Sequence, residues 1–224
     1  YELVFGDWSS DVCSSHLLEA MEEKQVTMGD ASLPLPQPFF VLATQNPIEH
    51  EGTFRLPEAQ LDRFMLKLLS DYPSEEDELA IVLANADRPS SSRLDDVREE
   101  LAPGDVECIK AAARAVRFEK AAAAYAVAII RASRPADGAA APQSLRELRR
   151  FIEFGASPRA SLALYRAARA GALLDGRDFV LPDDIKKAAP AVLRHRIVPS
   201  YEAEAERVGS EAIVRGILQA VAVP

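Results

Sequence analysis

One stretch of the sequence, residues 39–69, most constrains what the chain can fold into. It begins with an apolar run over residues 39–44, which is typical of a short strand buried on both faces of a parallel sheet. The run ends in polar residues, and Pro47 then prevents the strand from continuing. Because ligands of open α/β sheets lie beyond the carboxyl ends of strands, Asn46 stands where we expect a functional site.

A short helix and a second strand follow in the same stretch. Pro57 occupies a favoured first position of the helical segment PEAQLDRF, and Arg63 closes this helix. Residues 64–69 then have the pattern of another buried strand. An amide at a strand end and an arginine at a helix end form a pair suited to reading a phosphate, so Asn46 and Arg63 are the first two candidate residues.

A third candidate, Arg159, comes from the C-terminal half. Ser157 is a suitable N-cap and Pro158 a suitable first residue, which places Arg159 in the first turn of a helix predicted over residues 158–174. A cation at the positive end of a helix is electrostatically unfavourable unless an anion lies there. Phosphate groups commonly bind at helix N-termini, so the position of Arg159 indicates a phosphate contact.

Most of the remaining chain is predicted to be helical. Ser74 is an N-cap followed by three acidic residues, and this helix runs to about Ala86. Further helices are expected over residues 106–116 and 120–133, and every segment from Ser144 onward has a helical pattern.

Three groups of residues in the helical part receive plainer interpretations. Asp183 and Asp184 follow a proline and are interpreted as acids of a first helical turn rather than metal ligands. Residues 194–196, Arg-His-Arg, are interpreted as the basic end of a helix or as a contact with a neighbouring subunit. Three leucines of the predicted helix over 158–174 are interpreted as core: Leu162, Leu164 and Leu173.

The N-terminal part divides differently. Residues 1–16 show no sustained helical or strand period, and we interpret them as unrelated to the rest, an artefactual segment being favoured over a divergent N-terminus. Residues 26–39 contain a Gly-Asp turn signal and several prolines, which predict a small hairpin or an extended excursion. The predicted organisation is an unrelated segment over residues 1–16, an α/β part over residues 17–73 and a helical part over residues 74–224.

Composition excludes several classes of protein. Hydrophobic residues make up 48% and charged residues 27%, a balance that can fill a globular core. The net charge of -9 argues against a broad basic surface for nucleic acid. Cys13 and Cys108 lie too far apart in sequence to suggest a disulfide framework, and no metal site is expected. With no membrane-length apolar run and no signal peptide, we expect a soluble, cytoplasmic chain.

Two separated parts of the sequence resemble one known family. The segment ATQNPIEHEGTFRLPEAQLDRF resembles the stretch from sensor 1 to the arginine finger in MoxR-type AAA+ ATPases. The segment GASPRASLALYRAARAGALLDGRDFVLPDDIKKAAPAVLRHRI, followed by SYEAEAE, resembles the helical lid of that family. The likeness covers about residues 17–224. It implies a partial AAA+ α/β core, formed by the last strands of a parallel sheet, and an all-α lid subdomain behind it.

The resemblance also implies roles for the three candidates. Asn46 matches sensor 1, which orients the attacking water and contacts the terminal phosphate. Arg63 matches the arginine finger, which completes the site of the adjacent subunit, and Arg159 matches sensor 2, which couples the lid to the nucleotide. The implied catalytic residues are therefore Asn46 and Arg63, and the implied nucleotide-binding residues are Asn46 and Arg159.

The residues alone leave plainer alternatives open. Asn46 could be a capping amide before a proline turn. Arg63 could form an intramolecular salt bridge to Asp62 or Glu58, and Arg55 could compete for the finger role. Arg159 could be an exposed arginine that tolerates its position.

The functional expectation follows from the family. The resemblance implies ATP-driven, chaperone-like remodelling or maturation of partner proteins by a homo-oligomeric ring, expected to be a hexamer. It implies ATP and Mg²⁺ as cofactors and von Willebrand factor A-domain proteins as partners. The sequence has no G-x-x-x-x-G-K-[ST] motif and no apolar strand ending in Asp-Glu, so ligands for Mg²⁺ are missing and we expect the chain as given to be inactive alone.

Two alternative functions remain. The chain could be a non-catalytic helical interaction module that keeps the lid fold. It could also resemble a magnesium-chelatase-like AAA+ subunit or a replicative helicase, although the acidic net charge speaks against the helicase.

Overall fold

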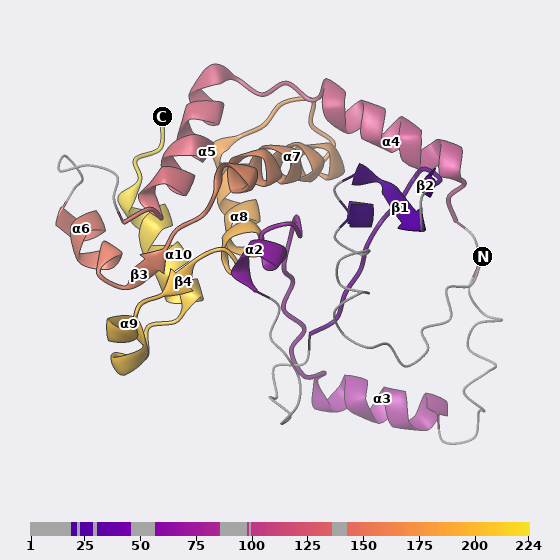
Figure 1. Ribbon diagram of the computed structural model, residues 1–224. Helices are drawn as coiled ribbons and strands as arrows, with labels where there is room; N and C mark the ends of the chain where they lie inside the picture. The colour runs from indigo at the N-terminus through magenta and orange to yellow at the C-terminus, as the bar shows by residue number, and fades with distance from the viewer. Residues whose placement is uncertain are drawn as a thin grey trace.

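The structure is a computed structural model that describes residues 19–21, 23–28, 31–45, 57–85, 98, 100–135 and 143–224. Its helices, labelled in Figure 1, are α2 (Glu58–Leu61), α3 (Glu75–Asn85), α4 (Pro103–Ala115), α5 (Lys120–Ala132), α6 (Gln143–Arg149), α7 (Pro158–Leu174), α8 (Pro182–Leu193), α9 (Tyr201–Ala205) and α10 (Ser210–Ala220). Its strands are β1 (Gln25–Met28), β2 (Ala31–Pro34), β3 (Ile152–Phe154) and β4 (Val198–Pro199).

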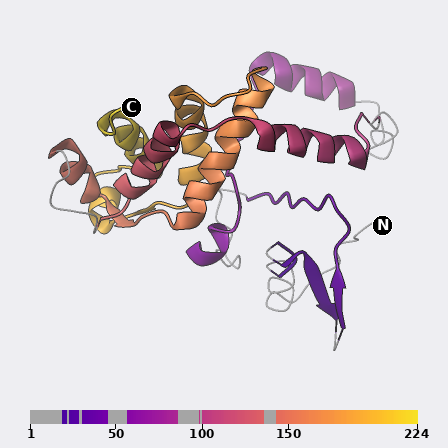
Figure 2. The same ribbon diagram turned by 90° about the horizontal axis from the view of Figure 1, so that it is seen from above.

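The hydrophobic core lies where α5, α7, α8 and α10 pack together, a cluster visible from two directions (Figures 1 and 2). Apolar residues recur every three or four positions along these helices, so that each turns one apolar face inward. Alanines cover the buried face of α7, and their small side chains let α8 approach closely. The largest side chains that are fully shielded from solvent are Ile129, Ile130, Leu164, Ile185, Leu193, Ile213 and Ile217.

The joint between α7 and α8 is fixed by an ion pair. Arg177 donates to both carboxylate oxygens of Asp184, at 2.6 and 2.8 Å, and Asp184 also accepts from the backbone N–H of Leu181 at 2.8 Å. The Arg177 guanidinium holds the pKa of Asp184 below its usual value. Because α8 begins at Pro182, Asp184 lies in its first turn, which confirms the interpretation of Asp184 as a first-turn acid.

Local sequence signals predicted several elements correctly. The helix expected over residues 158–174 is α7 with the same limits, and the helices expected after Ser74 and over residues 120–133 correspond to α3 and α5. The hairpin expected in residues 26–39 is the antiparallel pair of β1 and β2, in which Val26 lies opposite Leu33.

Two predictions about the helical part are wrong in detail. The segments after Ser144 are not all helical, because β3 and β4 form a short antiparallel pair. Leu162 is not a core residue: it is 58% exposed and is not among the buried residues of α7.

The two predicted buried strands are also wrong. Residues 39–45 and 64–73 run without helix or strand assignment, and several of their apolar side chains are exposed: Phe40 is 82% and Leu68 is 74% exposed. A buried parallel strand needs hydrogen-bonding neighbours on both sides, and among the described residues no strand lies beside these segments. The strands of the predicted partial AAA+ core are thus not formed in the described part of the chain.

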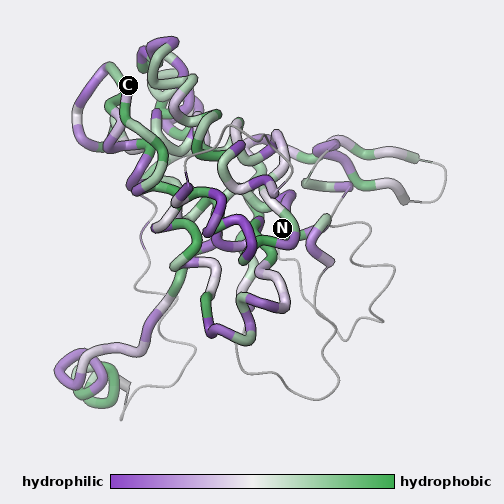
Figure 3. Tube along the Cα trace, turned by 90° about the vertical axis from the view of Figure 1, so that its left-hand side faces the viewer, coloured by the Kyte–Doolittle hydropathy of each residue, from purple (hydrophilic) through white to green (hydrophobic). Residues whose placement is uncertain are grey.

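One helix lies apart from this cluster. Figures 1 and 3 place α3 well below the packed helices, and Figure 3 shows hydrophobic and hydrophilic residues side by side along it. Its apolar residues Leu79, Ile81, Val82 and Leu83 are each more than half exposed. Over the described residues, no helix is both long and apolar enough to span a membrane.

Candidate functional site

Arg63 lies in the turn that ends α2. The backbone N–H of Arg63 donates to the carbonyl of Gln60 at 3.2 Å, and that of Phe64 donates to the carbonyl of Leu61 at 3.1 Å. The side chain of Arg63 is half-buried. The prediction that Arg63 closes this helix is wrong by a residue, because α2 ends at Leu61 with Asp62 as its C-cap and Arg63 follows in the turn.

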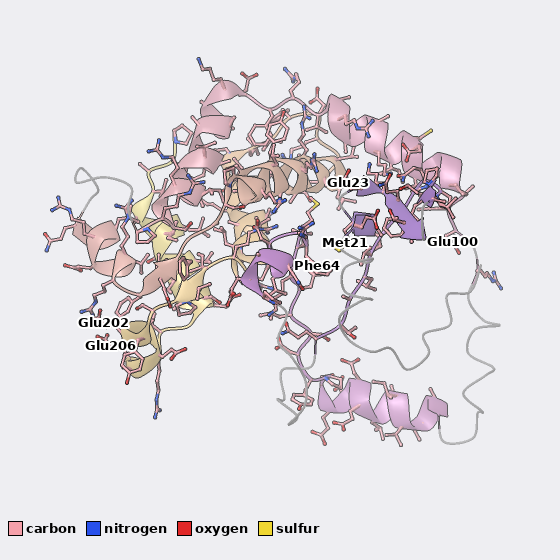
Figure 4. The ribbon with its side chains drawn as sticks, in the orientation of Figure 1. Met21, Glu23, Phe64, Glu100, Glu202 and Glu206 are labelled. Atoms are coloured by element: carbon pink, nitrogen blue, oxygen red, sulfur yellow. The ribbon has the colours of Figure 1, made fainter. Side chains whose placement is uncertain are left out.

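The segment that follows Arg63 is attached to the C-terminal end of α8. The backbone N–H of Lys67 donates to the carbonyl of Ala191 at 2.8 Å, and Arg194 donates through Nη1 to the carbonyl of Lys67 at 2.9 Å. His195 Nε2 lies 3.1 Å from the carbonyl oxygen of Phe64, a residue labelled beside α2 in Figure 4. We call residues 194–196 the basic clamp, because they hold residues 62–67 onto the lid.

Arg196 is the centre of the basic clamp. Its side chain is only 2% exposed, and each guanidinium nitrogen has a partner. Nε donates to Asp62 Oδ1 at 2.9 Å, Nη2 to the carbonyls of Asp62 and Phe64, and Nη1 to those of Met65 and Val192. Burial lowers the pKa of Arg196, and the bond to Asp62 opposes this effect. A buried guanidinium is tolerated only with such complete pairing.

His195 contributes a neutral ring to the basic clamp. It is 9% exposed, and burial together with the adjacent positive charge of Arg196 lowers its pKa to about 4. The ring is therefore neutral near pH 7. Because the carbonyl of Phe64 can only accept a hydrogen bond, Nε2 carries the proton in this tautomer.

Asp62 joins the basic clamp to the first turn of α7. Its Oδ2 accepts a hydrogen bond from Ser157 Oγ at 2.8 Å, and Ser157 Oγ accepts from the backbone N–H of Arg159 at 3.1 Å as the N-cap of α7. The guanidinium of Arg159 lies 3.7 Å from the same Oδ2. We call Asp62, Ser157, Arg159 and Arg196 the Asp62 cluster.

The loop that leads into α7 is held in place from behind. Ser133 Oγ donates to the carbonyl of Ile130 at 2.7 Å and accepts from the backbone N–H of Ala156 at 3.0 Å. Arg134 Nε donates to the carbonyl of Ala156 at 3.0 Å. A Cβ on Gly155 would lie 2.2 Å from the carbonyl oxygen of Ser133, so only glycine fits there. These contacts fix where Ser157 presents the N-terminus of α7.

The three candidate residues have different outcomes. Asn46 lies outside the described residues, as does Arg55, so the predicted pairing of Asn46 with Arg63 stays a prediction. Arg159 is brought to Asp62, the residue that directly precedes Arg63, although Arg63 and Arg159 are 96 positions apart in the numbering.

Sequence reasoning missed the role of the basic clamp. The structure shows Arg194 as the C-cap of α8, in agreement with the interpretation as a basic helix end, and it adds the binding of residues 62–67 of the same chain. The contact with a neighbouring subunit stays a prediction. The available signal was the clustering of three ionisable residues directly after the apolar end of α8. Nothing in that pattern identifies a partner that is 134 positions away.

The residues present fit part of a nucleotide site. Arg159 lies in the first turn of α7, where the helix dipole favours an anion, so its position is compatible with a terminal phosphate. No phosphate-cradling motif occurs in the sequence. Within the described ranges no group of His, Cys, Asp and Glu residues could hold a metal ion. The described residues thus place a cation at a helix N-terminus and hold no recognisable Mg²⁺ site.

Two family models match the sequence. The one described as "AAA lid domain" matches residues 148–217, and the one described as "ATPase family associated with various cellular activities (AAA)" matches residues 8–66. The first of these ranges contains Arg159 and the basic clamp, and the second contains Asn46 and Arg63. Together the two models match more than half of the chain.

Curated relatives and a solved structure agree with these matches. The chain is 40% identical over 210 residues to Chaperone MoxR1 of Mycobacterium tuberculosis, covering 94% of this chain and 53% of that protein. It is 32% identical over 226 residues to Protein MoxR of Methylorubrum extorquens, covering 93% of this chain and 62% of that protein. The crystal structure of a proposed ATPase from Cytophaga hutchinsonii superposes with a TM-score of 0.82 at 40% identity, over 94% of this chain and 62% of that one.

These matches identify the family and show how much of its members' length this chain covers. The chain spans between 53% and 62% of the length of the curated relatives it matches. It has the AAA+ ATPase fold with an AAA lid domain. The chain belongs to the MoxR family of AAA+ ATPases.

Proposed function

We propose that this chain supplies the lid and the finger segment, residues 57–69, of an ATP-hydrolysing, chaperone-like ring. The observation that carries the proposal is the contact of Arg159 with the carboxylate of Asp62, the residue directly before Arg63, while Arg196 holds the other oxygen of that carboxylate. In phosphoryl transfer, catalysis comes largely from positioning and from cations placed around the terminal phosphate. An arginine that contacts Asp62, next to a second arginine in the chain, supports such positioning.

Each residue has a distinct role in this proposal. Arg159 contacts the terminal phosphate bound to its own subunit, because it lies at the N-terminus of α7. Arg63 lies in a turn next to the lid, where its side chain is half-buried. It completes the site of the adjacent subunit. Asn46 orients the attacking water. ATP would supply the transferable phosphoryl group as substrate, and Mg²⁺ would neutralise part of its charge.

The assembly and the clients belong to the same proposal. We propose a homo-oligomeric ring, expected to be a hexamer, because a finger that acts on a neighbour requires a closed succession of identical interfaces. Remodelling or maturation of partner proteins, with von Willebrand factor A-domain proteins as partners, rests on the family alone. The 224-residue chain by itself is expected to show no ATP hydrolysis, since its sequence carries no phosphate-cradling motif.

The test is the Arg63→Ala variant of the complete gene product. Hydrolysis is expected to fall by about a thousandfold, the typical effect of removing an arginine finger, while ATP binding changes little. The matched control is Arg117→Ala, because Arg117 is a 64% exposed arginine that pairs with Asp178 at 3.3 Å, outside the Asp62 cluster. Equal loss of binding and hydrolysis would contradict the finger role of Arg63. A wild-type protein that neither binds nor hydrolyses ATP would instead favour the non-catalytic interaction module.

A further inference from the structure

We propose that Asp62 is a positioning residue that couples Arg159 to Arg63, because its carboxylate competes with a nucleotide phosphate for the Arg159 guanidinium. The inference rests on the proposed function and adds a regulatory link between two sites of that function. Asp62 does not touch substrate; it acts through the two arginines.

The two sides of the Asp62 cluster differ in strength. On one side, the Arg196 side chain is 2% exposed and its Nε lies 2.9 Å from Asp62 Oδ1, which makes a buried, well-aligned pair. On the other side, the Arg159 side chain is 53% exposed and its Nη1 lies 3.7 Å from Asp62 Oδ2. An exposed pair at that distance is weak. The first contact is therefore permanent, and the second is exchangeable.

A terminal phosphate is the stronger partner for Arg159. It carries more negative charge than one carboxylate and presents three acceptor oxygens. Because Arg159 lies at the positive end of α7, an anion there also gains from the helix dipole. Nucleotide binding is thus expected to withdraw Arg159 from Asp62.

The withdrawal reaches Arg63 through the backbone. Asp62 directly precedes Arg63. Arg196 donates hydrogen bonds to both the carboxylate and the backbone carbonyl of Asp62. When Arg159 leaves, Oδ2 of Asp62 keeps its hydrogen bond from Ser157, and the carboxylate is free to settle toward Arg196. The turn that carries Arg63 is displaced with it. By linkage, engagement of Arg63 by a neighbour must in turn change the affinity of Arg159 for phosphate.

The Asp62→Asn variant separates coupling from simple damage. The amide has almost the same shape but no charge, so it no longer competes for Arg159, and ATP is expected to bind about two- to fivefold more tightly. The same amide holds Arg196 less well, so Arg63 is misplaced and turnover is expected to fall by about tenfold or more. An unfolded or loosened site would weaken both quantities together.

Two further measurements sharpen the test. In an Arg159→Ala background, the Asp62→Asn change is expected to leave the affinity for a non-hydrolysable ATP analogue unaltered. The reason is that this background lacks the guanidinium for which Asp62 and the phosphate compete. Hydrogen exchange supplies a readout that needs no turnover: the analogue is expected to change the protection of the Lys67 amide in the wild type and to leave it unchanged in Asp62→Asn. The matched control is Asp178→Asn, whose carboxylate is 76% exposed and faces Arg117.

The outcomes are distinguishable. If Asp62→Asn lowers both affinity and turnover, or leaves affinity unchanged, the coupling is refuted while the ATPase proposal stands. If the wild-type gene product fails to bind ATP, the proposed function fails and the coupling falls with it. Should Asp62→Asn not fold, Ser157→Ala takes its place: it frees Oδ2 for Arg159, so ATP is expected to bind about twofold more weakly, and unchanged binding refutes the coupling.

Discussion

The lid and the finger segment both contain large apolar residues, but the lid buries them and the finger segment exposes them. In the lid, Leu164 and Leu193 are fully buried among α5, α7, α8 and α10. In the finger segment and beyond it, Leu68 is 74% and Tyr72 is 93% exposed. Helices satisfy their own backbone hydrogen bonds and need only an apolar face to pack, whereas strands need neighbours. The lid is therefore self-sufficient in this chain, and the finger segment depends on polar contacts with the lid.

That dependence is concentrated in the basic clamp. Residues 62–67 contribute exposed apolar side chains, and their carbonyl oxygens accept the hydrogen bonds of Arg194, His195 and Arg196. An attachment built from buried polar groups is specific in geometry, because each donor requires one acceptor. It places Arg63 without needing an apolar core beneath it.

The comparison is tested most strongly by a pair of leucine substitutions. Leu164→Ala opens a cavity in the fully packed lid and is expected to lower the free energy of unfolding by about 3–4 kcal/mol. Leu68→Ala removes an exposed side chain and is expected to change it by less than about 0.5 kcal/mol. Urea denaturation of the 224-residue chain measures both. Similar costs for the two variants would show that the finger segment has a packed core of its own.

The next effect concerns the basic clamp. Arg196→Ala leaves the carboxylate of Asp62 and several carbonyl oxygens without their donor, at an expected cost of about 3 kcal/mol in the free energy of unfolding. The amide of Lys67 is expected to lose its protection from hydrogen exchange, because the segment detaches from Ala191. The control Arg117→Ala, an exposed pair, is expected to cost less than about 1 kcal/mol. A Lys67 amide that stays protected without Arg196 would contradict the role of the clamp.

A smaller effect depends on pH. The folded chain holds the pKa of His195 at about 4, below its ordinary value of 6.5, so the unfolded chain binds the proton more readily between these values. The stability contributed by neutral His195 is therefore complete above pH 6.5 and is lost as the pH falls toward 4, by up to about 3 kcal/mol. His195→Gln should remove this slope, since its amide keeps a donor for Phe64 but does not titrate. An equal slope in both proteins would assign the effect to other groups.

The sequence predicts structure best where the interacting residues are close together in the chain. The limits of α7 were predicted correctly because Ser157 and Pro158 act within one helical turn. The contact of Arg196 with Asp62 spans 134 positions, and no local pattern encodes it. The strands over residues 39–44 and 64–69 were predicted from an apolar run, which describes the residues but not the neighbours that a strand requires.

The measurement that tests the central claim most directly is ATP turnover in mixed rings. Arg63→Ala and Arg159→Ala gene products are each expected to be nearly inactive alone. If Arg63 acts on the neighbour and Arg159 within its own subunit, an equal mixture of the two forms some interfaces with both arginines intact, and about a quarter of wild-type turnover is expected from random mixing. A mixture as inactive as either variant alone would contradict the account, because it would place both arginines in the same subunit's site.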